Sequence, residues 1–185
     1  EGEDAPPTVA QVGRLAHIKR QDALIRAASL LAARSEVGAF RVQLVGGPVQ
    51  EEPDYPTALE ALIRSLDPAP PVTLSGPLPH AEAAALLRRS AVTVNLSPPG
   101  SFDKAALEGL FAGKPTLVAN ADFAPLLGDA ADLLLGGGRV FKIIEFKDLA
   151  QGLLAAFDDG EVVERQVRDQ PPLQAAAQGR TSRRR

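Results

Sequence analysis

The chain contains no cysteine, methionine or tryptophan, and aromatic residues make up only 4% of its 185 residues. The absence of cysteine rules out disulfides and thiolate metal sites and fits a reducing compartment. No uninterrupted apolar run is long enough to span a bilayer, and no signal-peptide pattern opens the chain. We therefore expect a cytoplasmic protein whose core is built mainly from alanine, leucine and valine.

The charge is distributed unevenly along the chain. The net charge is −3, but the basic residues include Arg180, Arg183, Arg184 and Arg185 at the C-terminal end. Without these four, 16 basic residues stand against 23 acidic ones. An acidic body argues against nonspecific nucleic-acid binding, which requires clustered Lys and Arg to displace counterions. We interpret the terminal arginines as a solvated tail and expect no nucleic-acid partner.

Short apolar runs alternate with alanine- and leucine-rich helical patterns as far as about Asp158. The predicted strands are Thr8–Val12, Phe40–Val45, Val72–Ser75, Ala91–Leu96, Pro115–Ala119 and Ala131–Leu135. The predicted helices are Arg20–Arg34, Tyr55–Leu66, His80–Arg89, Asp103–Ala112, the single turn Phe123–Leu127, and Phe146–Phe157. Strands that are apolar throughout are typical of a sheet covered on both faces. The sequence predicts an α/β domain over residues 1–158 with a doubly wound, six-stranded parallel sheet, followed by a helix and partly disordered tail over residues 159–185.

Ligands of such sheets bind beyond the carboxyl ends of the strands, and two cations follow the first predicted strand there. Gly13 permits a tight turn, and Arg14 and Lys19 sit where the next helix points its free N–H groups. Arginine offers a planar fork for phosphate oxygens and lysine a compact charge. The segment favours a phosphate or diphosphate ligand, with solvated loop cations as the alternative. His17 lies in the same loop and is a candidate for a minor substrate contact.

A second segment, Ser97 to Glu108, joins a strand to a helix through a Pro/Gly loop. Ser101 is a candidate N-cap of that helix, and Lys104 lies in its first turn. A lysine there is unfavourable unless an anion is also present. Glu108 lies about one and a half turns into the helix. Its carboxylate either caps nearby donors, accepts hydrogen bonds from sugar hydroxyls, or is an ordinary surface residue.

Four motifs occur in order along the chain: Gly-Arg-Leu (13–15), Leu-Val-Gly-Gly (44–47), Leu-Ser-Gly-Pro-Leu-Pro (74–79) and Leu-Glu-Gly-Leu-Phe-Ala-Gly-Lys-Pro (107–115). Together they resemble the C-terminal, donor-binding domain of the family-4 (group 1) GT-B-fold retaining glycosyltransferases. The resemblance covers about Val9 to Phe157 and implies a Rossmann-like domain that binds a nucleotide-diphosphate sugar, without a metal or other cofactor.

The resemblance also implies roles for individual residues. Arg14 and Lys19 match the pair that neutralises the donor diphosphate and aids catalysis. Gly76 to Leu78 match the loop that faces the base, and Glu108 matches the residue that holds the ribose hydroxyls. The remaining donor contacts fall on Gly13 and on the loop and helix start made of Gly100, Ser101, Phe102, Asp103 and Lys104.

One position departs from the family pattern. Members commonly have a second Glu eight positions before the ribose Glu, aimed at the transferred sugar, and this chain has Gly100 there. Where many members continue with Phe-Gly, this chain has Phe102-Asp103-Lys104. We hypothesise that Asp103 or Lys104 takes over part of the sugar contact.

The resemblance implies a missing partner domain. The chain starts at Glu1 and contains no methionine, so we expect an excised or processed piece of a longer protein. An N-terminal acceptor-binding domain would complete the enzyme, and we expect a peripheral membrane contact if the acceptor is lipid-linked. The isolated chain is then expected to bind nucleotide sugar but to turn over little.

Two other readings stay open. One is a sugar-nucleotide epimerase or glycogen phosphorylase relative, which shares the two-domain architecture. The other is a non-catalytic, degenerate nucleotide-binding module in which Gly100 marks lost chemistry. The first strand is not followed by G-x-G-x-x-G, which counts against a dinucleotide oxidoreductase, and Gly109 to Lys114 is one residue short of a P-loop.

Overall fold

A computed structural model describes residues 5–35, 37–100 and 103–123 of the chain. Strands and helices alternate along these residues, as the sequence pattern predicts. The elements are β1 (Thr8–Val12), α1 (Gln21–Ala32), β2 (Arg41–Val45), α2 (Tyr55–Ser65), β3 (Val72–Leu74), α3 (His80–Arg89), β4 (Val92–Asn95), α4 (Lys104–Phe111) and β5 (Thr116–Val118), with 3-10 turns η1 (His17–Lys19) and η2 (Ala121–Phe123).

The strands form one parallel sheet in the order β3-β2-β1-β4-β5. The chain builds outward from β1 to β3, then returns to the other side of β1 for β4 and β5. This is the doubly wound, Rossmann-like α/β fold expected from the sequence. The described residues contain five strands rather than the six predicted. The predicted sixth strand, 131–135, the helix 146–157 and the tail 159–185 lie outside them.

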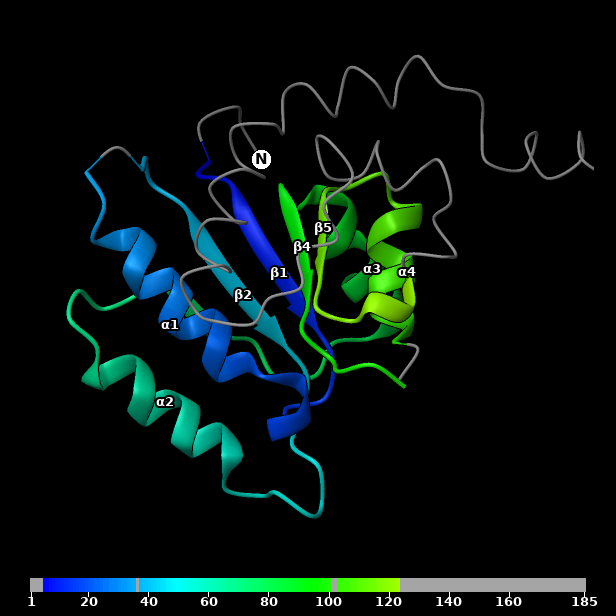
Figure 1. Ribbon diagram of the computed structural model, residues 1–185, viewed down its shortest axis with the longest axis horizontal. Helices are drawn as coiled ribbons and strands as arrows, with labels where there is room; N and C mark the ends of the chain where they lie inside the picture. Colours follow the sequence, from blue (N-terminus) through cyan, green and yellow to red (C-terminus); the bar gives the residue numbers. More distant parts are fainter. Residues whose placement is uncertain (1–4, 36, 101–102, 124–185) are drawn as a thin grey trace, which may run out of the picture.

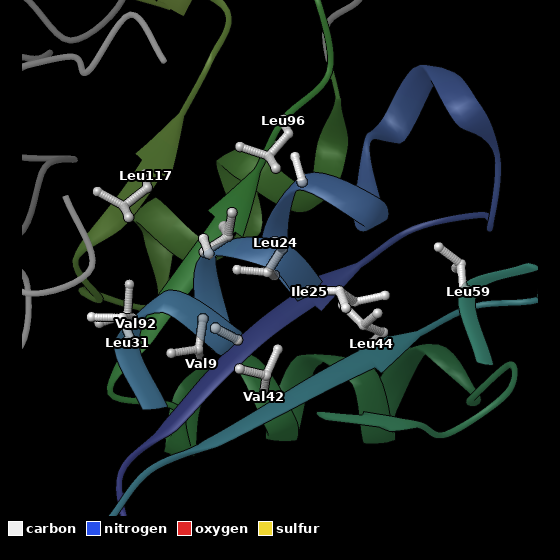
Figure 2. Packing of buried hydrophobic residues seen from close by; sticks show 14 of the residues in the cluster. Val9, Leu24, Ile25, Leu31, Val42, Leu44, Leu59, Val92, Leu96 and Leu117 are labelled. Atoms are coloured by element: carbon white, nitrogen blue, oxygen red, sulfur yellow. The ribbon is translucent and has the colours of Figure 1, made fainter. Parts of the chain in front are cut away.

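Helices cover both faces of the sheet, with α1 and α2 on one face and α3 and α4 on the other (Figure 1). The pleat explains this division, because successive side chains of a strand point to opposite faces. Val9 belongs to the larger core cluster with Leu24 and Leu31 of α1, whereas its neighbour Ala10 packs with Leu86 of α3. Figure 2 shows the larger cluster, in which aliphatic side chains from α1 meet those of β1, β2 and β4.

Helix α4 packs unusually close to the sheet because of a glycine. A Cβ atom added at Gly109 would lie 2.4 Å from Thr93 Oγ1 and 3.0 Å from Thr116 Oγ1. The two threonine hydroxyls are hydrogen-bonded to each other at 2.7 Å, so neither is free to swing away without losing that bond. Gly109 therefore serves helix–sheet packing, which explains a glycine in the P-loop-like stretch.

Substituting Gly109 by alanine is expected to destabilise the fold by about 1–3 kcal/mol, because the added methyl group overlaps the Thr93 hydroxyl. Urea unfolding of Gly109→Ala against wild type measures this loss. Gly38→Ala is the matched control, since a Cβ there meets nothing within 4 Å. An equal loss in both variants would contradict the packing role of Gly109.

Candidate functional site

The loops that carry the predicted site residues meet at one edge of the sheet, where the parallel strands end. The arrowheads of β1, β2 and β4 point toward this edge in Figure 1. The chain reverses its direction of winding between β1 and β4, and such a switch point opens a crevice for ligands in doubly wound sheets. The loops after these two strands carry Arg14 and Lys19 on one side and Asp103 on the other.

Backbone contacts between glycines hold three of these loops together. Gly13 N donates to Val45 O at 2.9 Å, and Gly46 N donates to Gly76 O at 2.9 Å. A Cβ atom at Gly46 would lie only 1.9 Å from Gly13 O, so no other residue fits there without moving the backbone. The predicted site residues Gly13 and Gly76 are thus brought together. Gly46, which belongs to the Leu-Val-Gly-Gly motif but is not among the predicted site residues, is the contact between them.

Two buried glutamines fix the backbone of the cationic loop. Gln21 Nε2 donates to Arg14 O at 2.9 Å, and Gln11 Nε2 donates to Lys19 O at 2.8 Å. Both glutamines are buried, at 4% and 1% exposure for Gln11 and Gln21. Each carbonyl group of the two predicted phosphate-binding residues therefore has a fixed partner. The sequence signal for Gln11 is a polar residue within an otherwise apolar predicted strand.

The Lys19 ammonium reaches across the switch point to the loop after β4. Its Nζ lies 2.5 Å from Asp103 Oδ2 and 3.1 Å from Ser97 Oγ. Ser97 Oγ donates to the same carboxylate oxygen at 3.0 Å. Only 14% of the Lys19 side chain and 13% of the Asp103 side chain are exposed. The structure therefore joins two predicted site residues directly, from positions far apart in the sequence.

Asp103 also begins helix α4. Its Oδ1 accepts a hydrogen bond from Ala105 N at 3.2 Å, so the N-cap is Asp103. The prediction of Ser101 as N-cap was wrong, because the helix starts at Lys104, one residue after this carboxylate. Ser101 and Phe102 themselves lie outside the described residues. Burial alone would raise the pKa of Asp103, but hydrogen bonds from Lys19, Asn95 and Ala105 and the charge of Lys19 outweigh it and lower the pKa.

Arg14 contrasts with Lys19. Its side chain is exposed and forms no hydrogen bond or ion pair with another residue of the described part of the chain. Its guanidinium thus retains all its donors at the edge where the strands end. Lys104 is exposed as well, at the first position of α4.

Glu108 is held by a histidine that appeared isolated in the sequence. His80 Nε2 lies 3.1 Å from Glu108 Oε1, with the His80 side chain 81% exposed and that of Glu108 34% exposed. His80 begins α3 directly after the Gly76–Pro79 loop, so this contact links that loop to α4. Leu78 anchors the loop, since it packs against the core cluster of α3 and β1. The predicted base-binding loop and the predicted ribose-binding residue are therefore neighbours.

Two further contacts shape the loops. The backbone N of His17 donates a hydrogen bond to Glu52 Oε2 at 2.6 Å, and the His17 ring Nδ1 lies 2.8 Å from the same oxygen. The centroid of the His17 ring lies 4.2 Å from that of Tyr55. These hydrogen bonds lower the pKa of Glu52. His17 thus fastens the Arg14–Lys19 loop to the loop before α2.

Gly100 adopts φ 86° and donates to Asp122 Oδ2 at 2.7 Å, which closes the loop after β4.

Some features are absent from the described residues. Residues 5–35, 37–100 and 103–123 contain no group of three or more His, Asp or Glu side chains placed to hold a metal ion. Over the same residues, no helix has the length and apolar character needed to cross a membrane.

A family model described as glycosyl transferases group 1 matches residues 6–159 of the chain. This chain belongs to the group 1 glycosyl transferases. Among curated relatives, the D-inositol 3-phosphate glycosyltransferase of Nocardia farcinica is 32% identical over 160 residues, 86% of this chain and 34% of the relative. That of Rhodococcus opacus is 37% identical over 109 residues, 59% of this chain and 24% of the relative. The chain thus spans about a third of the first relative and a quarter of the second.

Solved structures of glycosyltransferases share the fold of this group 1 chain. The catalytic domain of the cholesterol-α-glucosyltransferase of Helicobacter pylori aligns with a TM-score of 0.64 and 21% identity, covering 87% of this chain and 92% of that one. TarM of S. aureus aligns with a TM-score of 0.60 and 16% identity, covering 90% of this chain and 34% of that one. The Rossmann-like α/β fold predicted from the sequence is confirmed.

The Lys19–Asp103 pair makes the stability of this group 1 domain depend on pH in a defined way. The pKa of Asp103 is lower in the folded chain than its ordinary value of 3.8. Protons therefore bind this carboxyl more readily in the unfolded chain, and its stabilising effect is present above pH 4 and lost as the pH falls through the folded pKa.

We expect Asp103→Asn to unfold more easily than wild type by about 1–3 kcal/mol at pH 6, the range for hydrogen bonds to charged groups. That difference should shrink as the pH falls below 3.8. Urea titrations of both proteins between pH 3 and pH 6 measure it, because the other carboxyl groups are common to both and cancel. A difference that stays constant with pH would show that the charge of Asp103 does not stabilise the fold.

Proposed function

We propose that this chain is the donor-binding part of a glycosyltransferase that transfers a sugar from a nucleotide-diphosphate sugar to an acceptor with retention. The observation that carries the proposal is the placement of Arg14. It is an unpartnered guanidinium at the switch-point edge, on a loop whose backbone is fixed at both ends by buried glutamines. Lys19 and the first turn of α4 lie at the same edge.

The chemistry that this arrangement supports is electrostatic. When the bond between the sugar and the diphosphate breaks, negative charge grows on the departing phosphate oxygen. Donors aimed at that oxygen stabilise the charge best if they need no rearrangement at the moment of reaction. Arg14 supplies a planar fork for phosphate oxygens, and the backbone contacts of its loop keep it in place. No metal takes part in this proposal.

Structural relatives guide the choice of nucleotide for a first experiment. TarM of S. aureus and HepE of Anabaena have both been crystallised with UDP, and a trehalose-phosphate synthase of Burkholderia xenovorans with the same fold is UDP-forming. We therefore propose UDP as the probe for this chain, with GDP as the comparison. Glu108, partly exposed beside the Gly76–Leu78 loop, is the proposed partner of the ribose hydroxyls.

Removing one charge should separate recognition of the diphosphate from that of the ribose. Arg14→Ala is expected to weaken binding of both UDP and inorganic pyrophosphate by about ten- to a hundredfold, the range for a charge-assisted contact. Glu108→Ala should weaken the binding of UDP and leave the binding of pyrophosphate unchanged. Calorimetric titration of each of the two variants with UDP and with pyrophosphate measures these affinities. Arg88→Ala is the control, because it removes an equal charge from the last turn of α3, at the other end of that helix from His80. Equal losses for Arg14→Ala and Arg88→Ala would contradict the assignment.

We propose that the acceptor is bound by the part of the protein that this chain lacks, since the chain spans only 34% of its Nocardia relative. The isolated chain should then bind the donor but transfer little sugar. Incubation with UDP-glucose and water or simple alcohols, followed by UDP release, tests this. Turnover at the rate of an intact enzyme, typically about 1–1,000 per second, would contradict it.

A non-catalytic binding module is the competing proposal. It is favoured by Gly100, which stands where related enzymes commonly have a Glu, and whose backbone N–H is bound to Asp122. UDP-glucose binding more tightly than UDP would favour the transferase, because the sugar then has a site. Equal affinity for the two would favour the module.

A further inference from the structure

The side-chain cluster of Lys19, Ser97 and Asp103 contains a carboxylate that the family resemblance does not explain, because many members have glycine at that position. This carboxylate, that of Asp103, contacts Lys19 in the proposed diphosphate site. Asp103 Oδ2 is 2.5 Å from Lys19 Nζ and 3.0 Å from Ser97 Oγ. Both charged side chains are largely buried, with 13% and 14% exposure. The contact is thus a built part of the site rather than a chance surface pair.

The pair changes the charge that a ligand meets. Lys19 has three N–H donors, and Asp103 and Ser97 occupy two of them. One donor remains for a phosphate oxygen. The positive charge of Lys19 is balanced by a carboxylate at hydrogen-bond distance, and the low pKa of Asp103 keeps that carboxylate ionised at neutral pH. Among the two cations of the loop, only Arg14 presents an unbalanced charge.

A carboxylate in this position acts on a diphosphate in two opposing ways. It fixes the Lys19 ammonium before the ligand arrives, which lowers the ordering cost of binding. It also repels the anion across a short distance in a half-buried environment, where charges interact more strongly than in water. Asparagine keeps part of the first effect, because its single side-chain oxygen still accepts either from Lys19, as Asp103 Oδ2 does, or from Ala105 N, as Asp103 Oδ1 does. It removes the second effect entirely.

We propose that Asp103 is an internal counter-anion that holds Lys19 in place and limits the affinity of the site for nucleoside diphosphates. This inference rests on the proposed function, since it assumes that a diphosphate binds beside Lys19. Its effect is to keep the nucleoside diphosphate from binding too tightly after the sugar has left. Asp103 is thus a positioning and affinity-setting residue rather than a catalytic one.

Calorimetric titration of UDP at pH 7.5 and low salt tests the proposal. Asp103→Asn is expected to bind UDP three- to tenfold more tightly than wild type. Asp103→Ser is the second variant, because serine also caps helices and carries no charge. The gain should be smaller when Lys19→Gln is already present, because there is no ammonium left to release and only the repulsion between the carboxylate and the diphosphate is relieved. Glu60→Gln, which removes an exposed carboxylate on α2, should bind UDP as wild type does.

The outcomes are distinct. Unchanged or weaker UDP binding by both Asp103 variants overturns the proposal, and shows that the carboxylate only positions Lys19 or α4. Tighter binding of UDP together with loss of the extra affinity for UDP-glucose would show that Asp103 also contacts the sugar, while leaving the counter-anion role supported. A gain of the same size beside Lys19→Gln overturns the role of Lys19. If wild type binds neither UDP nor pyrophosphate, the proposed function fails and this inference fails with it.

Discussion

The contact between Lys19 and Asp103 joins the two halves of the doubly wound sheet. Lys19 ends the connection from β1 to α1, and Asp103 begins the helix that follows β4, so the ion pair spans the switch point itself. Crevices at switch points form because the chain leaves in opposite directions from neighbouring strands. Here a largely buried, charge-assisted contact joins the loops on the two sides of the switch point. Ser97 and the first turn of α4 are hydrogen-bonded to this pair.

The loops around this contact are held by backbone geometry more than by side chains. Gly46 approaches Gly13 so closely that a methyl group would overlap the Gly13 carbonyl oxygen, and Gly46 in turn donates to Gly76. The ends of β1, β2 and β3 are joined in this way by backbone contacts. A site built from such loops holds its donors in place before a ligand arrives, which is how a protein stabilises developing charge without a metal.

The sequence was sufficient for the fold because strand–helix alternation is a local pattern. It placed α3 at its observed bounds and β1 likewise, and it brought Arg14, Lys19, Gly13 and Gly76 to the correct edge. It did not reveal which side chains pair, since Lys19 and Asp103 are 84 residues apart and His80 and Glu108 are 28 apart. The cap of α4 was misplaced for a related reason. Serine and aspartate both cap helices well, and the sequence pattern did not show that the helix starts at Lys104, directly after the aspartate.

The double role of Asp103 restricts which residues evolution can place there. One carboxylate oxygen caps α4 and the other binds Lys19, so a substitution alters the stability of a helix and the charge of a ligand site in a single step. Residues without a side-chain acceptor weaken the cap, and acceptors without charge leave the lysine unbalanced. A substitution of Asp103 therefore changes the start of α4 and the surroundings of Lys19 together.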